Sequence, residues 1–274
     1  MPNLVKAKQE RHYGKTMESG LEEKLKEFSE LIKIEGTGEG FKTPIFYKFL
    51  VKYIRIIGRS LTRVNYTGIE KVPKKGPVIV IGNHISNIDP IVKIMGIGRP
   101  VHYLAKEGHF TKEPNRTIMR ATGQIETFRD TGARDALARA ADVLNSGLCL
   151  GLFPEGTRSR NGEAPFLQKG KTGVARLSAS FPDVPVLPMA LIGTREVMKP
   201  GDNAIRFWKK INVNIDDPIT FNQWLLNKNG GNMDNNKIKE MIKLNHADRE
   251  VEMKKIYRKF TDQVMKNLED LGAP

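Results

Sequence analysis

The 274-residue sequence is poor in cysteine: Cys149 is the only one, and it lies inside an apolar stretch. A single thiol excludes a disulfide framework and fits a reducing compartment. No run of 18 apolar residues is present, so we expect no membrane-spanning helix, and the N-terminus does not resemble a cleavable signal peptide. Lysine and arginine residues outnumber aspartate and glutamate residues. The net charge of +14 favours a polyanionic partner, either a nucleic acid or an anionic membrane surface.

Motifs for metals and nucleotides are also missing from the sequence. There is no HExxH, no cysteine cluster and no grouping of carboxylates with histidines at ligand spacing, so we expect no metal and no cofactor. A glycine-rich nucleotide fingerprint is absent as well. Without aromatic RNP blocks or CxxC fingers, nucleic-acid binding is supported by charge alone, and an anionic membrane surface is the favoured partner.

The most informative stretch follows a continuous apolar run, Val78–Ile81, which predicts a buried parallel strand. His84 leaves the carboxyl end of this strand, where ligand sites of open α/β sheets lie. Asp89 and Pro90 carry the signals of an N-cap and a first helical position. The spacing lets Asp89 fold back onto the imidazole, as in the base half of a catalytic triad. Taken alone, this spacing more often marks a helix cap and a polar loop residue than a catalytic pair, because short motifs match often by chance.

A second motif about seventy residues further on favours the catalytic interpretation. The segment Phe153–Arg160 again follows an apolar strand pattern, Leu148–Leu152. Its glutamate, the backbone amides around Gly156, and Arg158 with Arg160 suit a phosphorylated substrate, because a guanidinium fork matches phosphate geometry. No serine or cysteine sits in a nucleophile elbow, so the base is expected to activate a hydroxyl of the substrate.

Together the two motifs carry a family resemblance. Asn-His-x-Ser-x-x-Asp at 83–89 and Phe-Pro-Glu-Gly-Thr-Arg-Ser at 153–159 resemble the glycerolipid acyltransferases, in particular the 1-acyl-sn-glycerol-3-phosphate acyltransferases. Residues 123–129 resemble the second block of that family, and residues 184–189 resemble the fourth. The four blocks stand in the family order and span roughly residues 65–219. The first and third blocks are specific, whereas the second and fourth are weak signals on their own.

The resemblance implies transfer of a fatty acyl group from acyl-CoA or acyl carrier protein to the sn-2 hydroxyl of 1-acyl-glycerol 3-phosphate, which forms phosphatidic acid. It implies that His84 is the general base and that Asp89 supports it, with direct attack on the thioester and no acyl-enzyme. Backbone amides near Gly156 are the expected oxyanion donors. A related enzyme acting on another lysophospholipid or on glycerol 3-phosphate is the alternative; a catalytically inactive membrane-binding module is disfavoured by the intact His84 and Asp89.

The resemblance also implies a set of substrate-binding residues. Arg158 and Arg129 match arginines of the third and second blocks, and Lys106 matches a lysine that family members carry after the following strand. Glu155 is expected either to order its loop through Ser159 or an arginine, or to contact the acceptor. The expected substrate-binding residues are Lys106, Arg129, Glu155, Gly156, Thr157 and Arg158. Arg160 and Lys169 are candidate outer cations, and His102 and His109 are expected to be structural or exposed.

Residues 44–64 predict an amphipathic helix that starts at Pro44, with no acidic residue before Glu70. One face carries the basic residues Lys48, Lys52, Arg55, Arg59 and Arg63. Roughly opposite lies an apolar stripe of Phe46, Leu50, Tyr53, Ile57, Leu61 and Val64. The pattern fits a membrane-surface helix or an ordinary core helix about equally, and the implied lipid substrate favours the membrane. This predicts a peripheral or monotopic protein on the cytoplasmic face of the cell membrane.

The expected fold is α/β, with a central mixed, mainly parallel sheet flanked by helices and an N-terminal amphipathic membrane-docking element. The expected strands are 78–82, 101–105, 123–128, 148–152 and 185–192, with a pair of short strands in 205–215. The expected helices are 90–97, 113–121, 131–146, 169–180 and an interrupted segment in 238–271. Four segments are expected: a charged mobile arm (1–43) containing one helix, the docking helix (44–64), the acyltransferase core (65–220), and a C-terminal loop and helical extension (221–274). Residues 65–77 are expected to form a hairpin or loop.

Overall fold

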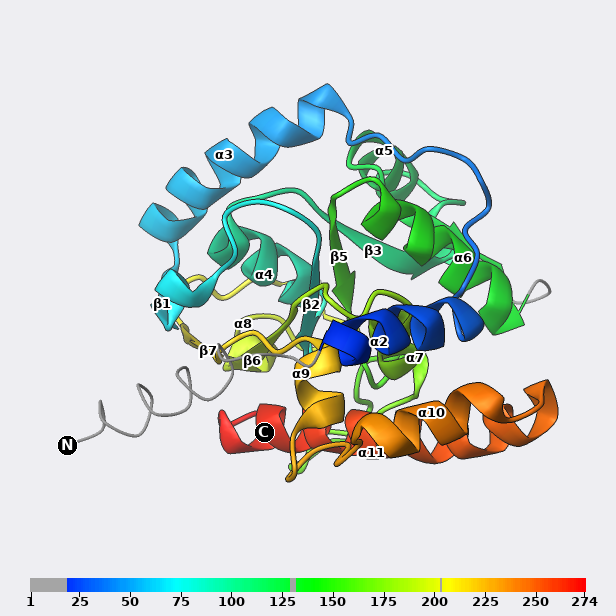
Figure 1. Cartoon of the computed structure of the whole chain (residues 1–274). Coiled ribbons are helices and arrows are strands. Elements are labelled where there is room, and N and C mark those ends of the chain that lie inside the picture. The colour runs from blue at the N-terminus through cyan, green and yellow to red at the C-terminus, as the bar shows by residue number, and fades with distance from the viewer. Residues whose placement is uncertain (1–18, 129–131, 203) are drawn as a thin grey trace.

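The computed structural model describes residues 19–128, 132–202 and 204–274, which build one seven-stranded sheet with helices on both faces (Figure 1). The strand order is β1-β7-β6-β2-β5-β3-β4, and every pairing is parallel except β6 with β7. The strands are β1 (Arg63–Thr67), β2 (Val78–Gly82), β3 (Val101–Lys106), β4 (Ile125–Thr127), β5 (Cys149–Leu152), β6 (Val186–Ile192) and β7 (Lys210–Ile215). The mixed, mainly parallel sheet confirms the expected fold class.

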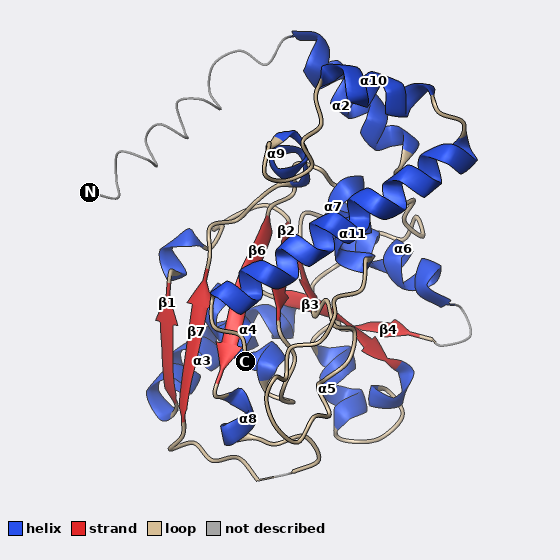
Figure 2. Ribbon diagram, turned by 90° about the horizontal axis from the view of Figure 1, so that it is seen from below, coloured by secondary structure: helices blue, strands red, loops and turns tan. Residues whose placement is uncertain are grey.

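Helices cover the two faces of the sheet unequally, and α11 runs diagonally across one of them (Figure 2). The helices are α2 (Ser19–Leu31), α3 (Ile45–Leu61), α4 (Asp89–Ile97), α5 (Asn115–Ala121), α6 (Gly132–Asn145), α7 (Gly173–Ser180), α8 (Thr194–Val197), α9 (Phe221–Leu226), α10 (Asn235–Lys243) and α11 (His246–Asp270). Two 3₁₀ turns, η1 (Ile69–Lys71) and η2 (Glu107–His109), are also present among the described residues.

The central strand β2 is apolar on both faces, as strands buried between two helical layers must be. Ile79 and Ile81 pack in the core formed with α2, α6, α7, α9, α10 and α11. Val78 and Val80 point the other way, into a second core with α3 and α4. This alternation is the period of two of a strand, and it explains why the run 78–81 contains no polar residue.

The structure corrects three expectations about the chain around this core. Of the two alternatives for 65–77, the hairpin does not form: the segment contains the end of β1, which pairs in parallel with β7, and then a loop with η1. The segment 205–215 forms a loop followed by one strand, β7, and not a pair of strands. β7 lies between β1 and β6 in the sheet, so both of its edges are paired with other strands. The helix expected near the N-terminus exists as α2, but it is not a mobile appendage, because Leu25 and Phe28 are buried in the core. Residues 1–18 lie outside the described residues.

The expected amphipathic helix is present as α3, and its core-facing side differs from its apolar stripe. Tyr47 and Val51 are the buried residues of α3, and the Tyr47 hydroxyl donates to the Val101 carbonyl. The stripe stands outward: Phe46, Tyr53, Ile57 and Leu61 are exposed, while Leu50 and Val64 are half-buried. Three further apolar residues that the stripe did not include are exposed too, namely Ile45, Phe49 and Ile56. The helix therefore packs on the domain while most of its apolar surface faces outward.

Candidate active site

Two loops meet at one edge of the sheet because their strands are parallel neighbours. Ile81 of β2 pairs with Leu152 of β5, and both chains leave the sheet in the same direction. The first loop leads to His84, and the second begins at Phe153. The Phe153 ring stacks on the His84 imidazole with centroids 4.0 Å apart. The two motifs that the sequence separates by seventy residues thus form one site, at the place that the doubly wound architecture provides.

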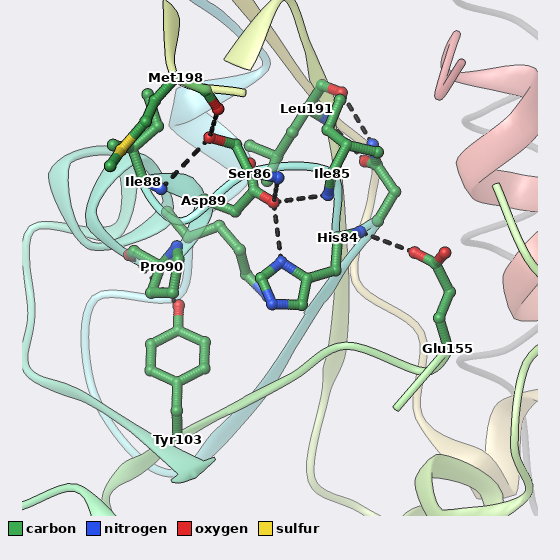
Figure 3. A network of polar contacts seen from close by, with 12 residues as sticks. His84, Ile85, Ser86, Ile88, Asp89, Pro90, Tyr103, Glu155, Leu191 and Met198 are labelled. Atoms are coloured by element: carbon green, nitrogen blue, oxygen red, sulfur yellow. Dashed lines mark hydrogen bonds and ion pairs between the residues drawn. The ribbon is translucent and has the colours of Figure 1, made fainter. Parts of the chain in front are cut away.

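His84 and Asp89 form the expected pair (Figure 3). Asp89 Oδ2 lies 2.8 Å from His84 Nδ1 and accepts from the backbone amides of Ile85 and Ser86, each at 2.7 Å. Because that oxygen accepts both amides as a carboxylate, His84 Nδ1 is the donor, and Nε2 keeps its lone pair. The expectation that Asp89 is the helix cap is wrong: the N-cap position is Ile88, and Asp89 is the first residue of α4, fully buried.

Burial sets the protonation state of the imidazole. It lowers the pKa of His84 below its usual value, although the Asp89 carboxylate opposes the shift by its hydrogen bond and its charge. Arg158 and Lys93 lower this pKa further, because each brings a positive charge near the ring. Neutral His84 is therefore favoured near pH 7, and a neutral imidazole with a free Nε2 can take a proton.

Glu155 ties the two loops together through backbone amides. Its carboxylate accepts from the His84 amide at 2.7 Å and from the Gln168 amide at 3.1 Å. The Ser159 amide returns a bond to the His84 carbonyl at 2.9 Å. Burial raises the pKa of Glu155 to about 7 against the lowering effect of both amide bonds. Among the described residues, the hydrogen bonds of the Glu155 carboxylate are thus with backbone amides and not with the Ser159 side chain or an arginine.

The turn after Glu155 places backbone amides and one guanidinium beside the pair. The amide of Gly156 donates to the Phe153 carbonyl at 2.8 Å, so it is engaged within the turn and is not an oxyanion donor in this conformation. Gly156 has φ of +72°, and a Cβ there would lie 2.9 Å from atoms of the Lys171 side chain. Among the described residues, the amides of Thr157 and Arg158 have no protein acceptor. The side-chain nitrogen Arg158 Nη1 is buried and has no hydrogen-bond acceptor among the described residues.

The remaining candidates are spread more widely. Lys106 stands exposed at the end of β3, and Arg129 lies outside the described residues. Arg160 and Lys169 are exposed. His102 is fully buried between the Thr43 hydroxyl and the Gly123 carbonyl, which confirms a structural role, whereas His109 is exposed.

Sequence reasoning missed Lys93, which is fully buried behind the site. Its ammonium donates to the carbonyls of Val80 and Leu152, both at 3.0 Å, near the ends of β2 and β5. The same nitrogen lies 4.3 Å from the centroid of the Phe153 ring that stacks on His84. Burial lowers the pKa of Lys93 to about 7, with Asp89 opposing the shift. The signal in the sequence was a lysine four residues after Asp89, on the same helix face, inside an otherwise apolar segment.

An apolar cavity of about 370 Å³ lies beside the first loop. It is bounded by α3, α4, α8 and the chain leading into β7. Ile88, which directly precedes Asp89, lines this cavity. Most of the other lining side chains are apolar, among them Leu50, Ile57, Val92, Met95 and Phe207. The cavity therefore borders the loop that bears His84 and Asp89.

In the part of the chain that the structure describes, no three histidine, cysteine, aspartate or glutamate side chains gather as metal ligands would. Across residues 19–128, 132–202 and 204–274, helices of sufficient length and apolar character to cross a bilayer are also missing.

The geometry defines an α/β protein with a buried His–Asp pair at its strand ends, and part of the chain is similar to known proteins. Residues 63–192 match the family model described as Acyltransferase, and this range contains both loops of the site. This match agrees with the resemblance that the motifs carry.

Individual relatives share the same name. The chain is 32% identical over 134 residues to a 1-acyl-sn-glycerol-3-phosphate acyltransferase of Borreliella burgdorferi, covering 48% of this chain and 52% of that protein. It is 29% identical over 178 residues to the chloroplastic LPAT1 of the same description from Arabidopsis thaliana, covering 64% and 49%. The chain thus spans about half the length of these relatives. The solved structure of the 1-acyl-sn-glycerophosphate acyltransferase PlsC from Thermotoga maritima shares the fold, with a TM-score of 0.54 and 23% identity over 83% of this chain and 82% of that one.

Proposed function

We propose that the protein transfers a fatty acyl group from a thioester, acyl-CoA or acyl carrier protein, to the sn-2 hydroxyl of 1-acyl-glycerol 3-phosphate. The product is phosphatidic acid, the entry compound of phospholipid biosynthesis. The observation that carries the proposal is the hydrogen bond of 2.8 Å between His84 Nδ1 and a fully buried Asp89, at the edge of the sheet where the arginine loop also lies. The relatives that bear this enzyme's name support the choice of substrates.

The proposed chemistry needs one proton transfer to start it. His84 Nε2 takes the proton of the acceptor hydroxyl while Asp89 holds Nδ1–H and stabilises the imidazolium that forms. The hydroxyl oxygen attacks the thioester carbonyl carbon, the C–S bond breaks, and the thiolate leaves with the proton that His84 returns. No bond to the protein forms in this sequence. The amides of Thr157 and Arg158, which lack protein acceptors, are the candidate donors to the developing oxyanion.

The acceptor phosphate is proposed to lie at Arg158. A guanidinium nitrogen that is buried without a partner is costly unless a ligand satisfies it, and a phosphate oxygen is the acceptor it fits best. Lys106 and Arg129 are proposed as further cations for that phosphate. Glu155, Gly156 and Thr157 are proposed to shape the binding loop, with Glu155 acting through the amides of His84 and Gln168.

An acyl chain is proposed to occupy the apolar cavity beside Ile88. An apolar chain gains roughly 0.8 kcal/mol for each CH₂ removed from water, and the cavity of about 370 Å³ takes many such groups. Because Ile88 lines the cavity and directly precedes Asp89, an acyl chain in the cavity would lie close to the proposed catalytic loop.

The outward apolar face of α3 is proposed to dock the protein on the cytoplasmic face of the cell membrane without spanning it. Exposed apolar side chains such as Phe46, Phe49 and Leu61 would lie at the acyl boundary, and the basic stripe beside them would meet anionic headgroups. A helix that used its apolar stripe to pack on the core would instead bury these residues.

Incubation of the purified protein with lysophosphatidate and acyl-CoA or acyl carrier protein, followed by mass spectrometry of the lipids, tests the proposal. Phosphatidate is the expected product with at least one donor. Product from glycerol 3-phosphate or from another lysophospholipid, with none from lysophosphatidate, would favour the related acyltransferase instead. No ester product from any of these pairs would refute the proposed function.

A further inference from the structure

A short turn outside α3 exposes two aromatic residues to solvent. The backbone amide of Lys209 donates to the Arg206 carbonyl at 3.0 Å, so Phe207 and Trp208 occupy the tip of the turn. Phe207 is 51% exposed and Trp208 is 65% exposed. The base of the turn is fixed, since the Arg206 amide donates to the Val197 carbonyl of α8 at 2.9 Å. A turn that is anchored at its base and apolar at its tip needs an explanation, because exposure of such side chains to water is unfavourable.

The turn and the exposed face of α3 share one cavity. Phe207 and Ile205 line the same apolar cavity as Tyr53 and Ile57 of α3. Ile205, Tyr53 and Ile57 are themselves exposed, so the wall of the cavity continues into the outer surface on both sides. The turn that carries Phe207 and Trp208 and the helix α3 therefore lie on two sides of one apolar region.

Charge around the turn matches that around α3. Lys209 and Lys210 follow the aromatic pair, and both are exposed. Arg206 is paired with Asp202 at 2.7 Å, which leaves the acidic side chain beside the turn neutralised. Cations bordering exposed aromatic residues suit a surface that is anionic outside and apolar inside, which is the order found in a bilayer of anionic lipids. The corresponding face of a second copy of this chain would bring the same cations together, and such a contact is disfavoured by like charge.

We infer that the turn Arg206–Lys209 is a second membrane-docking element, which inserts Phe207 and Trp208 into an anionic bilayer opposite α3, so that the cavity between them opens directly into the lipid. Tryptophan favours this depth because its ring is apolar and its N–H reaches polar headgroups. The inference rests on the proposed function for the lipid nature of the substrate. It adds an orientation: an acyl chain passes from the membrane to Ile88 without crossing water.

The two tryptophans of the chain make a direct test. Trp224 is 2% exposed in the core, so the variant Trp224→Phe keeps Trp208 as the single fluorophore. With vesicles of phosphatidylglycerol and phosphatidylcholine, Trp208 emission is expected to shift to shorter wavelength and to be quenched by lipids brominated on the acyl chain. Vesicle binding with an unshifted, unquenched Trp208 would overturn the inference, as would concentration-dependent self-association that shifts the emission without lipid.

A second variant keeps the test independent of the fluorophore and of Trp224. Trp208→Ser is expected to weaken vesicle partitioning about tenfold, at high salt as well as low, because it removes apolar burial and not charge. The matched control is Val251→Ser, a similarly exposed apolar position on α11, which should partition like wild type. Equal partitioning of Trp208→Ser and wild type would overturn the inference. Acyl transfer to detergent-dispersed lysophosphatidate, measured in parallel, tests the proposed function separately.

Discussion

Nε2 of His84 points away from Asp89, because the other ring nitrogen, Nδ1, donates to Asp89 Oδ2. The same oxygen also accepts the backbone amides of Ile85 and Ser86. The geometry thus fixes the tautomer of His84 before any substrate arrives.

The buried ammonium of Lys93 is expected to tune this base. Because burial lowers the pKa of Lys93 to about 7, the group is charged in the acid range, where it lowers the pKa of His84. The substitution Lys93→Met removes that charge, so the His84 pKa should rise and the acid limb of kcat/KM should move to higher pH. Its thermal stability should change little, since an apolar side chain replaces a buried cation. An unmoved acid limb in a folded variant would contradict this account of Lys93.

Arg158→Ala is expected to raise the KM for lysophosphatidate roughly ten- to hundredfold, the loss of one charge-assisted bond to phosphate. The KM for acyl-CoA should change much less. The loop should stay folded, because its ties run through Glu155 and the Ser159 backbone. Steady-state kinetics with each substrate varied in turn make the comparison. Equal effects on both substrates would assign Arg158 a structural role.

At the scale of elements, the site depends on the register of two strands and on one carboxylate between their loops. Glu155 keeps its proton up to about pH 7, whereas a glutamate in the unfolded chain loses it near its usual pKa of about 4.3. The folded state therefore binds more protons in this window, and stability falls as pH rises through it.

Glu155→Gln removes this titration. The difference in unfolding free energy between wild type and Glu155→Gln should fall between about pH 4.5 and 7, by up to about 3 kcal/mol, and then stay level. Denaturant titrations at several pH values measure it. The variant should also lose activity, because an amide cannot accept from both the His84 and Gln168 backbones as a carboxylate does. A pH-independent difference would mean that Glu155 is ionised throughout.

The helix α3 yields a prediction about salt. Arg59 packs over the Tyr66 ring, with its guanidinium 4.7 Å from the ring centroid, and Arg55 packs against Gly98. These two cations therefore contact the domain itself and are less available to lipid headgroups. Changing the exposed Lys48, Lys52 and Arg63 to glutamine should weaken sedimentation with anionic vesicles at low salt, at roughly 1 kcal/mol per cation, and little at high salt. Activity on detergent-dispersed substrate should survive. Wild-type sedimentation of the triple variant at low salt would remove these residues from the membrane contact.

Periodicity predicted the elements that bury a continuous or alternating apolar set, such as β2 and α6. It failed where structure depends on distant partners. β1 is a polar five-residue edge strand that forms because β7 pairs with it. No local sequence pattern predicts this pairing. Motif spacing predicted the approach of His84 and Asp89. The contacts of Glu155 and the burial of Lys93 depend on which strands are neighbours in the sheet, and the sequence does not state that order.

At the scale of the whole molecule, the two faces of the sheet have different roles. One face carries α2, α6, α7 and the C-terminal helices around a large core. The other carries α4 under α3, beside the apolar cavity. Because the loops of His84 and Phe153 leave the sheet at the strand ends next to that cavity, both proposed substrates would approach the molecule from one side.

The most direct test of the account is single-turnover formation of phosphatidate from lysophosphatidate and acyl-CoA or acyl carrier protein, with wild type, His84→Ala and Asp89→Asn compared at pH 7.5. The account predicts product with wild type and a loss of roughly 10²- to 10⁴-fold in each variant, with the fold retained by circular dichroism. No acyl group should be covalently attached to the protein at any time. Turnover by His84→Ala at the wild-type rate, or a trapped acyl-enzyme, would contradict direct transfer with His84 as the base.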